Sequence, residues 1–140
     1  FVFEAGGRKL VVSGDTRYCD NLVRAAQGAD LVVHEVFVHG QMPVKGTRTE
    51  EGLANVAAYH TASTDVGKVA ARAGAGCLLL THIVPPDADR FRLLSEARAE
   101  FDGPVIVGED LMTVDLVEGT VCHGSVTFAL PSVKPGKRTG

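Results

Sequence analysis

The chain has 140 residues and a formal net charge of −3, with 45% hydrophobic and 22% charged residues. This composition is ordinary for a globular domain that is long enough to bury a core. There is no basic patch to indicate a nucleic-acid surface. No apolar run approaches the roughly 20 residues of a bilayer-spanning helix, so we expect no membrane association.

The first part of the chain predicts a hairpin, a short helix and a strand. Residues 1–4 and 9–13 are mostly apolar and flank a pair of glycines, which is typical of a β-hairpin. Residues 19–30 carry apolar side chains on one side and end near a glycine, which predicts a short helix. Residues 31–37 are rich in β-branched side chains and predict a strand. Residues 38–48 contain glycine and proline and predict an irregular segment.

Helices and strands alternate in the middle of the chain. A helix is expected over residues 50–58 and a clearer one over residues 64–76, where apolar residues recur at helical spacing. Residues 77–82, with the sequence CLLLTH, predict a fully buried strand that ends on a histidine. Another helix is expected over residues 90–101, followed by a strand over residues 104–110.

The last elements complete an α/β pattern. Residues 111–124 predict a hairpin that turns at Glu118-Gly119, and residues 131–140 predict a loose tail. Strands that alternate with helices imply βαβ units and a largely parallel sheet. Because no internal repeat or linker divides the chain, we expect residues 1–130 to form one structural unit.

Side chains able to bind metal or move protons gather at the ends of successive strands. They are Asp15, His34, Glu35, His82, Glu109 and Asp110. Because ligands of an open α/β sheet bind outside the carboxyl ends of its strands, we expect these residues along one edge. Imidazole and carboxylate together are ligands for zinc, manganese or iron, whereas an all-oxygen magnesium site would not need a histidine.

Each of these residues also has a purely structural interpretation. Asp15 can cap a turn, His82 can be a core histidine bonded to backbone, Glu35 can pair with a cation, and Asp110 can close a turn. His60, in the polar segment before a helix, is either a surface histidine or a proton-transfer group. A metal site is favoured because it alone would explain why imidazole and carboxylate groups follow several successive strands at one edge of the sheet.

The three cysteines are scattered without CxxC spacing, which argues against a zinc ribbon or a disulfide framework. We expect reduced structural thiols, which favours a cytoplasmic protein. A metal-free α/β ligand-binding module is the alternative from another functional class. It has little support, because no G-x-G-x-x-G follows the first strands.

Three segments, in order and spacing, resemble the C-terminal half of metallo-β-lactamase-fold hydrolases. They read VVSGDT, ADLVVHEVF and YHTASTDVGKVAARAGAGCLLLTHIVP. The resemblance covers about residues 1–115 and is strongest to the tRNase Z and arylsulfatase-like branch. It implies that the chain supplies the C-terminal half of an αββα sandwich.

The resemblance implies roles for particular residues. Asp15 would bridge two metal ions and His82 would bind the second of them. His60, with Glu35, would act in proton transfer or charge stabilisation. His34 corresponds to the histidine beside that glutamate. His34 and Asp110 are expected to orient the ligands without touching the metal, as hydrogen-bonded partners of metal ligands do.

The resemblance also implies an activity and a cofactor. We expect a hydrolase of sulfate or phosphate esters with two divalent ions, zinc first and manganese or iron as alternatives, in which a metal-activated water attacks the ester. The alternative is a tRNA 3′-end processing endonuclease. The residues after His82 include no arginine before Arg90, which favours a small ester substrate over nucleic acid.

The HxHxDH motif of the family is absent from the chain. We therefore expect a fragment or processed half whose partner is the missing N-terminal half. Alone it is expected to be inactive, and its uncovered sheet face makes a homo-oligomer an expected outcome.

Overall fold

The structure is a computed structural model that describes residues 1–42 and 49–130. The predicted tail, and part of the predicted irregular segment, lie outside the described residues. In chain order the elements are β1 Val2–Ala5, β2 Arg8–Val12, α1 Asp20–Ala25, β3 Leu31–Phe37, α2 Glu50–Tyr59, α3 Ser63–Ala73, β4 Leu78–Val84, α4 Arg90–Arg98, β5 Val105–Val107, β6 Thr113–Asp115, β7 Thr120–His123 and β8 Val126–Ala129.

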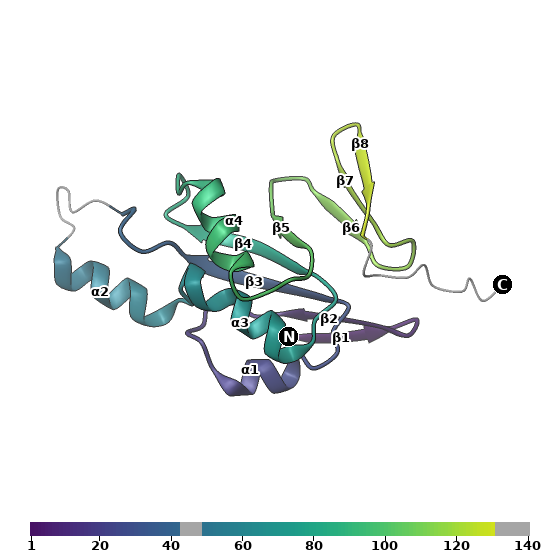
Figure 1. The fold of residues 1–140 in the computed structure, drawn as a ribbon, viewed down its shortest axis with the longest axis horizontal. Helices are drawn as coiled ribbons and strands as arrows, with labels where there is room; N and C mark the ends of the chain where they lie inside the picture. Colours follow the sequence, from purple (N-terminus) through teal and green to yellow (C-terminus); the bar gives the residue numbers. More distant parts are fainter. Residues whose placement is uncertain (43–48, 131–140) are drawn as a thin grey trace.

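The main sheet has five strands in the order β1-β2-β3-β4-β5 (Figure 1). Strands β2 to β5 pair in parallel, and β1 joins β2 as an antiparallel hairpin. This arrangement confirms the predicted α/β class, and β4 pairs with β3 on one side and β5 on the other. The carboxyl ends of β2, β3 and β4 therefore meet at one edge. The prediction of a fully buried strand over residues 77–82 is wrong at its end, because Thr81 and His82 are exposed.

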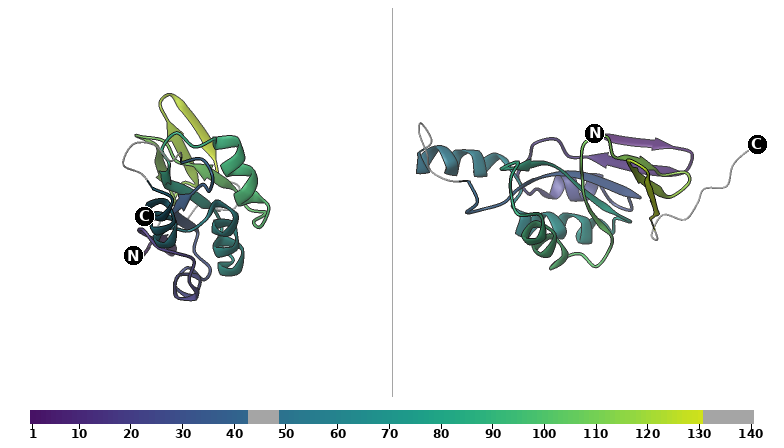
Figure 2. Two further views of the ribbon diagram at one scale, coloured as in Figure 1. Left: turned by 90° about the vertical axis from the view of Figure 1, so that its left-hand side faces the viewer. Right: turned by 90° about the horizontal axis from the view of Figure 1, so that it is seen from above.

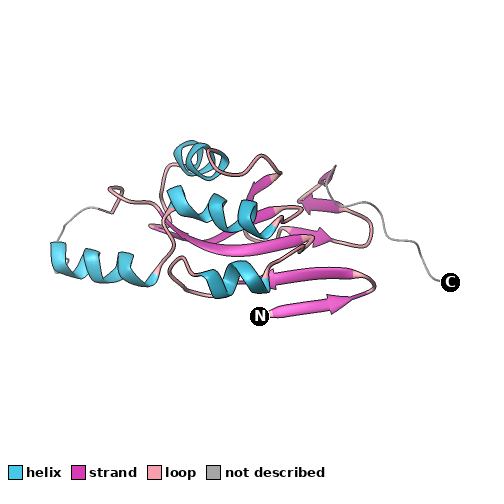
Figure 3. Cartoon of the chain, turned by 60° about the horizontal axis from the view of Figure 1, so that its bottom comes forward, coloured by secondary structure: helices cyan, strands magenta, loops and turns pink. Residues whose placement is uncertain are grey.

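Helices α1, α3 and α4 cover one face of this sheet (Figure 3). The predicted apolar stripe of α3 is fully buried there, at Val66, Val69, Ala70 and Ala73. Helix α4 packs so closely on α3 that a Cβ on Gly67 would lie 2.1 Å from the carbonyl oxygen of Ala97. Glycine is therefore required at this contact.

Helix α2 differs from the other helices. It has no buried residue and extends from one end of the molecule (Figures 1 and 2). The Thr49 hydroxyl caps its start by accepting from the Gly52 N–H, and His60 closes its end. The helix thus delivers His60 toward the sheet edge. No helix among the described residues is both long and apolar enough to cross a membrane.

The opposite face of the main sheet meets a separate three-stranded sheet, β6-β7-β8. The predicted hairpin supplies β6 and β7, but β8 was not predicted. A second apolar cluster joins the two sheets, with Leu31, Cys77 and Ile106 from the main sheet. All three cysteines are free, as expected, and burial raises the pKa of Cys77 to about 11.

Helices α3 and α4 each end three residues earlier than expected, and two other elements are about half the expected length or less. Helix α1 ends at Ala25 rather than near residue 30. Strand β5 ends at Val107 rather than at residue 110. Gly108 packs against β4 there, since a Cβ on it would lie 2.7 Å from the carbonyl oxygen of Leu80. Glu109 and Asp110 consequently lie in the turn beyond the strand.

Candidate active site

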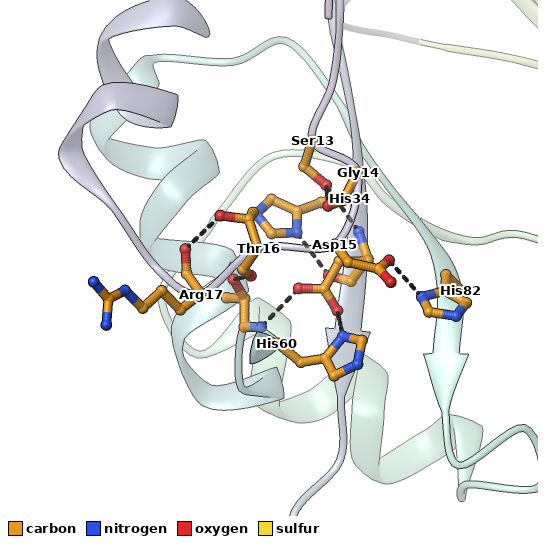
Figure 4. A network of polar contacts seen from close by, with 10 residues as sticks. Ser13, Gly14, Asp15, Thr16, Arg17, His34, His60 and His82 are labelled. Carbon is orange, nitrogen blue, oxygen red and sulfur yellow. Dashed lines mark hydrogen bonds and ion pairs between the residues drawn. The ribbon is translucent and has the colours of Figure 1, made fainter. Parts of the chain in front are cut away.

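Asp15 and His82 lie beside each other at the edge where β2 and β4 end. The chain leaves β2, turns at Gly14 with a φ of 63°, and presents Asp15. Its Oδ1 is 2.8 Å from Nδ1 of His82, and both side chains are more than half exposed. Figure 4 shows the two side chains pointing toward one another. The prediction that they share one sheet edge is confirmed.

The sequence predicted that His82 ends its strand, but β4 continues to Val84. The pairing of β3 with β4 shifts register at this point: Glu35 faces Thr81, and the next residue of β3 faces Ile83. His82 is thus the extra residue of a β-bulge, which redirects a side chain. Its φ of 41° is left-handed, a strain of about 1–3 kcal/mol that is typical of functional sites.

His60 is held by a buried carboxylate. Its Nδ1–H donates to Oε2 of Glu35 over 2.8 Å, and Glu35 is only 2% exposed. The backbone N–H of Thr61 donates to the other oxygen over 2.7 Å. The segment after α2 runs beside the end of β3, through a bridge between Phe37 and Ala62. His60 is therefore fixed by backbone as well as by its own hydrogen bond.

Burial dominates the electrostatics of Glu35 and raises the pKa of its carboxyl group. Hydrogen bonds from Thr61 and His60 oppose this effect because they stabilise the ionised form. Glu35 is thus paired, but with a histidine rather than with lysine or arginine. The carbonyl of Thr61, in turn, accepts from the N–H of Phe37 over 2.8 Å.

Three potential metal ligands converge in front of this pair. Asp15, His60 and His82 each offer one ligand atom, and these atoms lie within 4.8 Å of one another. Because Nδ1 of His60 is bonded to Glu35, its Nε2 is the atom left to face the cluster. Carboxylate oxygen and imidazole nitrogen are zinc ligands. These donors therefore fit the expected metal.

His34 points to the same side of β3 as Val32 and Val36, which belong to the helix-covered core, and it is not one of the three potential metal ligands. It is fully buried, and its Nδ1–H donates to the carbonyl of Glu35 over 2.6 Å. Its Nε2 has no partner among the described residues, and burial lowers the pKa of His34 to about 4. The expected ligand-orienting role of His34 stays a prediction.

Asp110 lines a pocket of about 490 Å³ beside His82, together with Arg90 and Glu109. Within the described part of the chain no hydrogen bond joins Asp110 to Asp15, His60 or His82. Its role toward the ligands also stays a prediction.

Two polar residues that support the site were not predicted. Thr61 is 1% exposed and also donates its hydroxyl to the carbonyl of Thr16 over 2.7 Å. The hydroxyl of Ser13 accepts from the N–H of Glu35 over 3.2 Å. Neither role has a spacing signal in the sequence, although Thr61 directly follows His60.

Comparisons with known proteins agree with this geometry. No protein-family model matches the chain. The ribonuclease Z of Myxococcus xanthus (strain DK1622) is 41% identical over 111 residues, 79% of this chain and 33% of that protein. A putative ribonuclease Z of Mycobacterium tuberculosis (strain CDC 1551 / Oshkosh) is 34% identical over 123 residues, 83% of this chain and 51% of that protein.

A solved structure is similar as well. The metallo-β-lactamase fold protein YhfI from Bacillus subtilis matches with a TM-score of 0.62 and 29% identity, over 77% of this chain and 40% of that one. The chain thus spans between a third and a half of the length of these similar proteins. Sequence and structure together show that the chain has the metallo-β-lactamase fold and is similar to ribonuclease Z proteins over more than three quarters of its length.

Proposed function

We propose that the protein containing this chain is a metal-dependent hydrolase that cleaves phosphodiester bonds in RNA. The observation that carries the proposal is the convergence of Asp15, His60 and His82, with His60 bonded to the buried Glu35. The similarity to proteins named ribonuclease Z supports RNA as the substrate class. The finer assignment, tRNA 3′-end processing, rests on the resemblance of the sequence motifs.

Asp15 and His82 are the residues that would hold a divalent metal, zinc by the nature of the donors. Both are more than half exposed, so a metal and a substrate have access to them. A metal there supplies Lewis-acid polarisation of the phosphoryl group. The bulge at His82 aims its imidazole at Asp15, so the ligand pair is set by the backbone.

His60 and Glu35 are proposed to handle the proton. The Glu35 carboxylate fixes the proton of His60 on Nδ1, so Nε2 is directed to the open side of the cluster. In the imidazolium form of His60, the Nε2–H gives its proton to the leaving oxygen of the substrate, and the ring returns to the neutral Nδ1–H form. Glu35 stabilises the positive charge on His60 before this transfer, as a buried carboxylate does for a catalytic histidine.

Hydrolysis of small sulfate or phosphate esters is the second candidate. It was the main expectation from the sequence, because no arginine follows His82 before Arg90. In the structure, the pocket beside His82 carries Glu109 and Asp110 as well as Arg90, so it is not a purely cationic site. The similar proteins favour RNA over this candidate.

The test is an activity comparison on the full-length protein. Purified protein is loaded with zinc or manganese and assayed on a precursor tRNA, on bis(4-nitrophenyl) phosphate and on 4-nitrophenyl sulfate. We expect cleavage of the RNA and hydrolysis of the diester, with little action on the sulfate. Hydrolysis of the sulfate ester without RNA cleavage would replace the proposal by the second candidate.

A further inference from the structure

A second pocket, of about 630 Å³, begins at Asp15 and does not include His82 in its lining. It is lined by Asp15, Thr16, Arg17, Ala58 and Tyr59. One wall is the loop after β2, and the other is the last turn of α2. Only Asp15 also belongs to the metal cluster. Asp15 therefore connects this pocket with the three potential metal ligands.

The two walls of this pocket are fastened to each other. The buried Thr61 donates its hydroxyl to the carbonyl of Thr16 and its N–H to Glu35. The first bond holds the β2 loop against the residue that follows α2 and His60. The pocket is thus preformed, so its walls lose little conformational entropy when a ligand binds.

The side chains in the pocket are free to bind. Arg17 is exposed, and no carboxylate among the described residues pairs with it. In Figure 4 its side chain extends away from the pair formed by Asp15 and His82. Tyr59 is 72% exposed. By contrast, Arg72 is bonded to Tyr18 and Asp20, so its guanidinium is already occupied.

The pocket beside His82 has different chemistry. There the Arg90 guanidinium donates to the carbonyls of Ala88 and Pro86, and two carboxylates line the same space. Carboxylates repel a phosphate, so that pocket is a poor place for the backbone of a nucleic acid. A free guanidinium binds phosphate, and an exposed aromatic ring stacks on a base. The Arg17 pocket offers both groups.

We infer that Arg17 and Tyr59 form a nucleotide subsite for single-stranded RNA. Arg17 binds a backbone phosphate next to the scissile one, and Tyr59 stacks on the adjoining base. This inference rests on the proposed function and adds the direction in which the substrate leaves the cluster. Nucleic acid thus runs from Asp15 across the end of α2.

The experiment measures RNA binding by the full-length protein in a chelator, which prevents cleavage. A short fluorescein-labelled single-stranded RNA is titrated and its anisotropy recorded at several salt concentrations. Arg17→Ala and Tyr59→Ala should each raise Kd about fivefold or more, the usual effect of losing one stacking residue or phosphate contact. Tyr59→Phe should bind like wild type. Arg17→Ala should also reduce the salt slope by about one.

Matched controls lie on α4. Arg98→Ala removes the same charge and Phe91→Ala removes an exposed ring, both outside the pocket. Unchanged Kd for Arg17→Ala and Tyr59→Ala overturns the inference. So does equal weakening by the controls, or a wild type that does not bind the RNA. The proposed function is judged separately, by cleavage of precursor tRNA by the metal-loaded wild type.

Discussion

His34 makes the stability of this fold sensitive to acid. The imidazole is fully buried, and its Nδ1–H is given to the carbonyl of Glu35, so in the neutral ring Nε2 carries only a lone pair. Nothing in the described part of the chain bonds to Nε2. Protonation would place both a charge and an unpaired N–H in the core, where each is costly.

The size of the effect follows from the pKa of His34, which burial lowers from 6.5 to about 4. Above pH 6.5 the ring is neutral in the folded and unfolded chains, and the stabilisation is fully present. As the pH falls from 6.5 toward 4, His34 binds a proton in the unfolded chain but stays neutral in the folded chain. The free energy of unfolding therefore decreases. At about 1.4 kcal/mol per pKa unit, the total loss approaches roughly 3 kcal/mol, with about 2 kcal/mol reached by about pH 5.

The assay compares urea unfolding of wild type and His34→Asn at about pH 7.5 and about pH 5, with a chelator to remove metal effects. Asparagine keeps a donor for the Glu35 carbonyl but does not titrate in this range. All other groups titrate in both proteins, so the difference between their pH dependences belongs to His34. Parallel losses of stability in the two proteins would refute the reasoning.

Further predictions concern the site and the packing. Asp15→Ala and His82→Ala should lose both bound metal and turnover. His60→Ala should keep its metal while kcat falls roughly 10²–10⁴-fold, and loss of metal in this variant would make His60 a ligand instead. Glu35→Gln should lower kcat in the same way. The double variant His60→Ala/Glu35→Gln should have a kcat no lower than either single variant, and additive losses of kcat would contradict this prediction. His82→Gly should be more stable to urea than His82→Ala by about 1 kcal/mol, because only glycine adopts its positive φ without strain; equal stability would remove the strain argument. Gly67→Ala should cost about 1–3 kcal/mol in thermal unfolding, since its Cβ would lie 2.1 Å from an oxygen of α4, and an unchanged melting temperature would show that α3 and α4 can separate freely.

The elements of the main sheet were predictable because their signals are local. The apolar residues of α3 at helical spacing predict a helix and the side of it that is buried. The apolar run of β4 predicts a core strand. The alternation of strands with helices then places the carboxyl ends of parallel strands together, and the contact of Asp15 with His82 follows from that rule.

Other features depend on contacts that the sequence does not display. Strand β8 forms by pairing with β7, and its four residues are all exposed, so they carry no burial pattern. The bulge at His82 arises from the pairing of two strands, and the run LLLTHIV gives no sign of it. Likewise, the approach of His60 to Glu35 depends on the bridge between Phe37 and Ala62, which joins residues far apart in the chain.

Glu35 connects these predictable and unpredictable parts. It lies on a core strand, yet its carboxylate bonds to His60 and Thr61 from the segment after α2, and its own N–H reaches Ser13 from the β2 loop. Burying a carboxylate costs free energy unless such donors bind it. The hydrogen bonds to Glu35 therefore favour the arrangement in which these segments lie together. The same bonds fix the tautomer of His60 and fasten the wall of the Arg17 pocket. The proposed catalytic role of His60 and the proposed RNA subsite therefore depend on one buried group, which is not itself one of the three potential metal ligands.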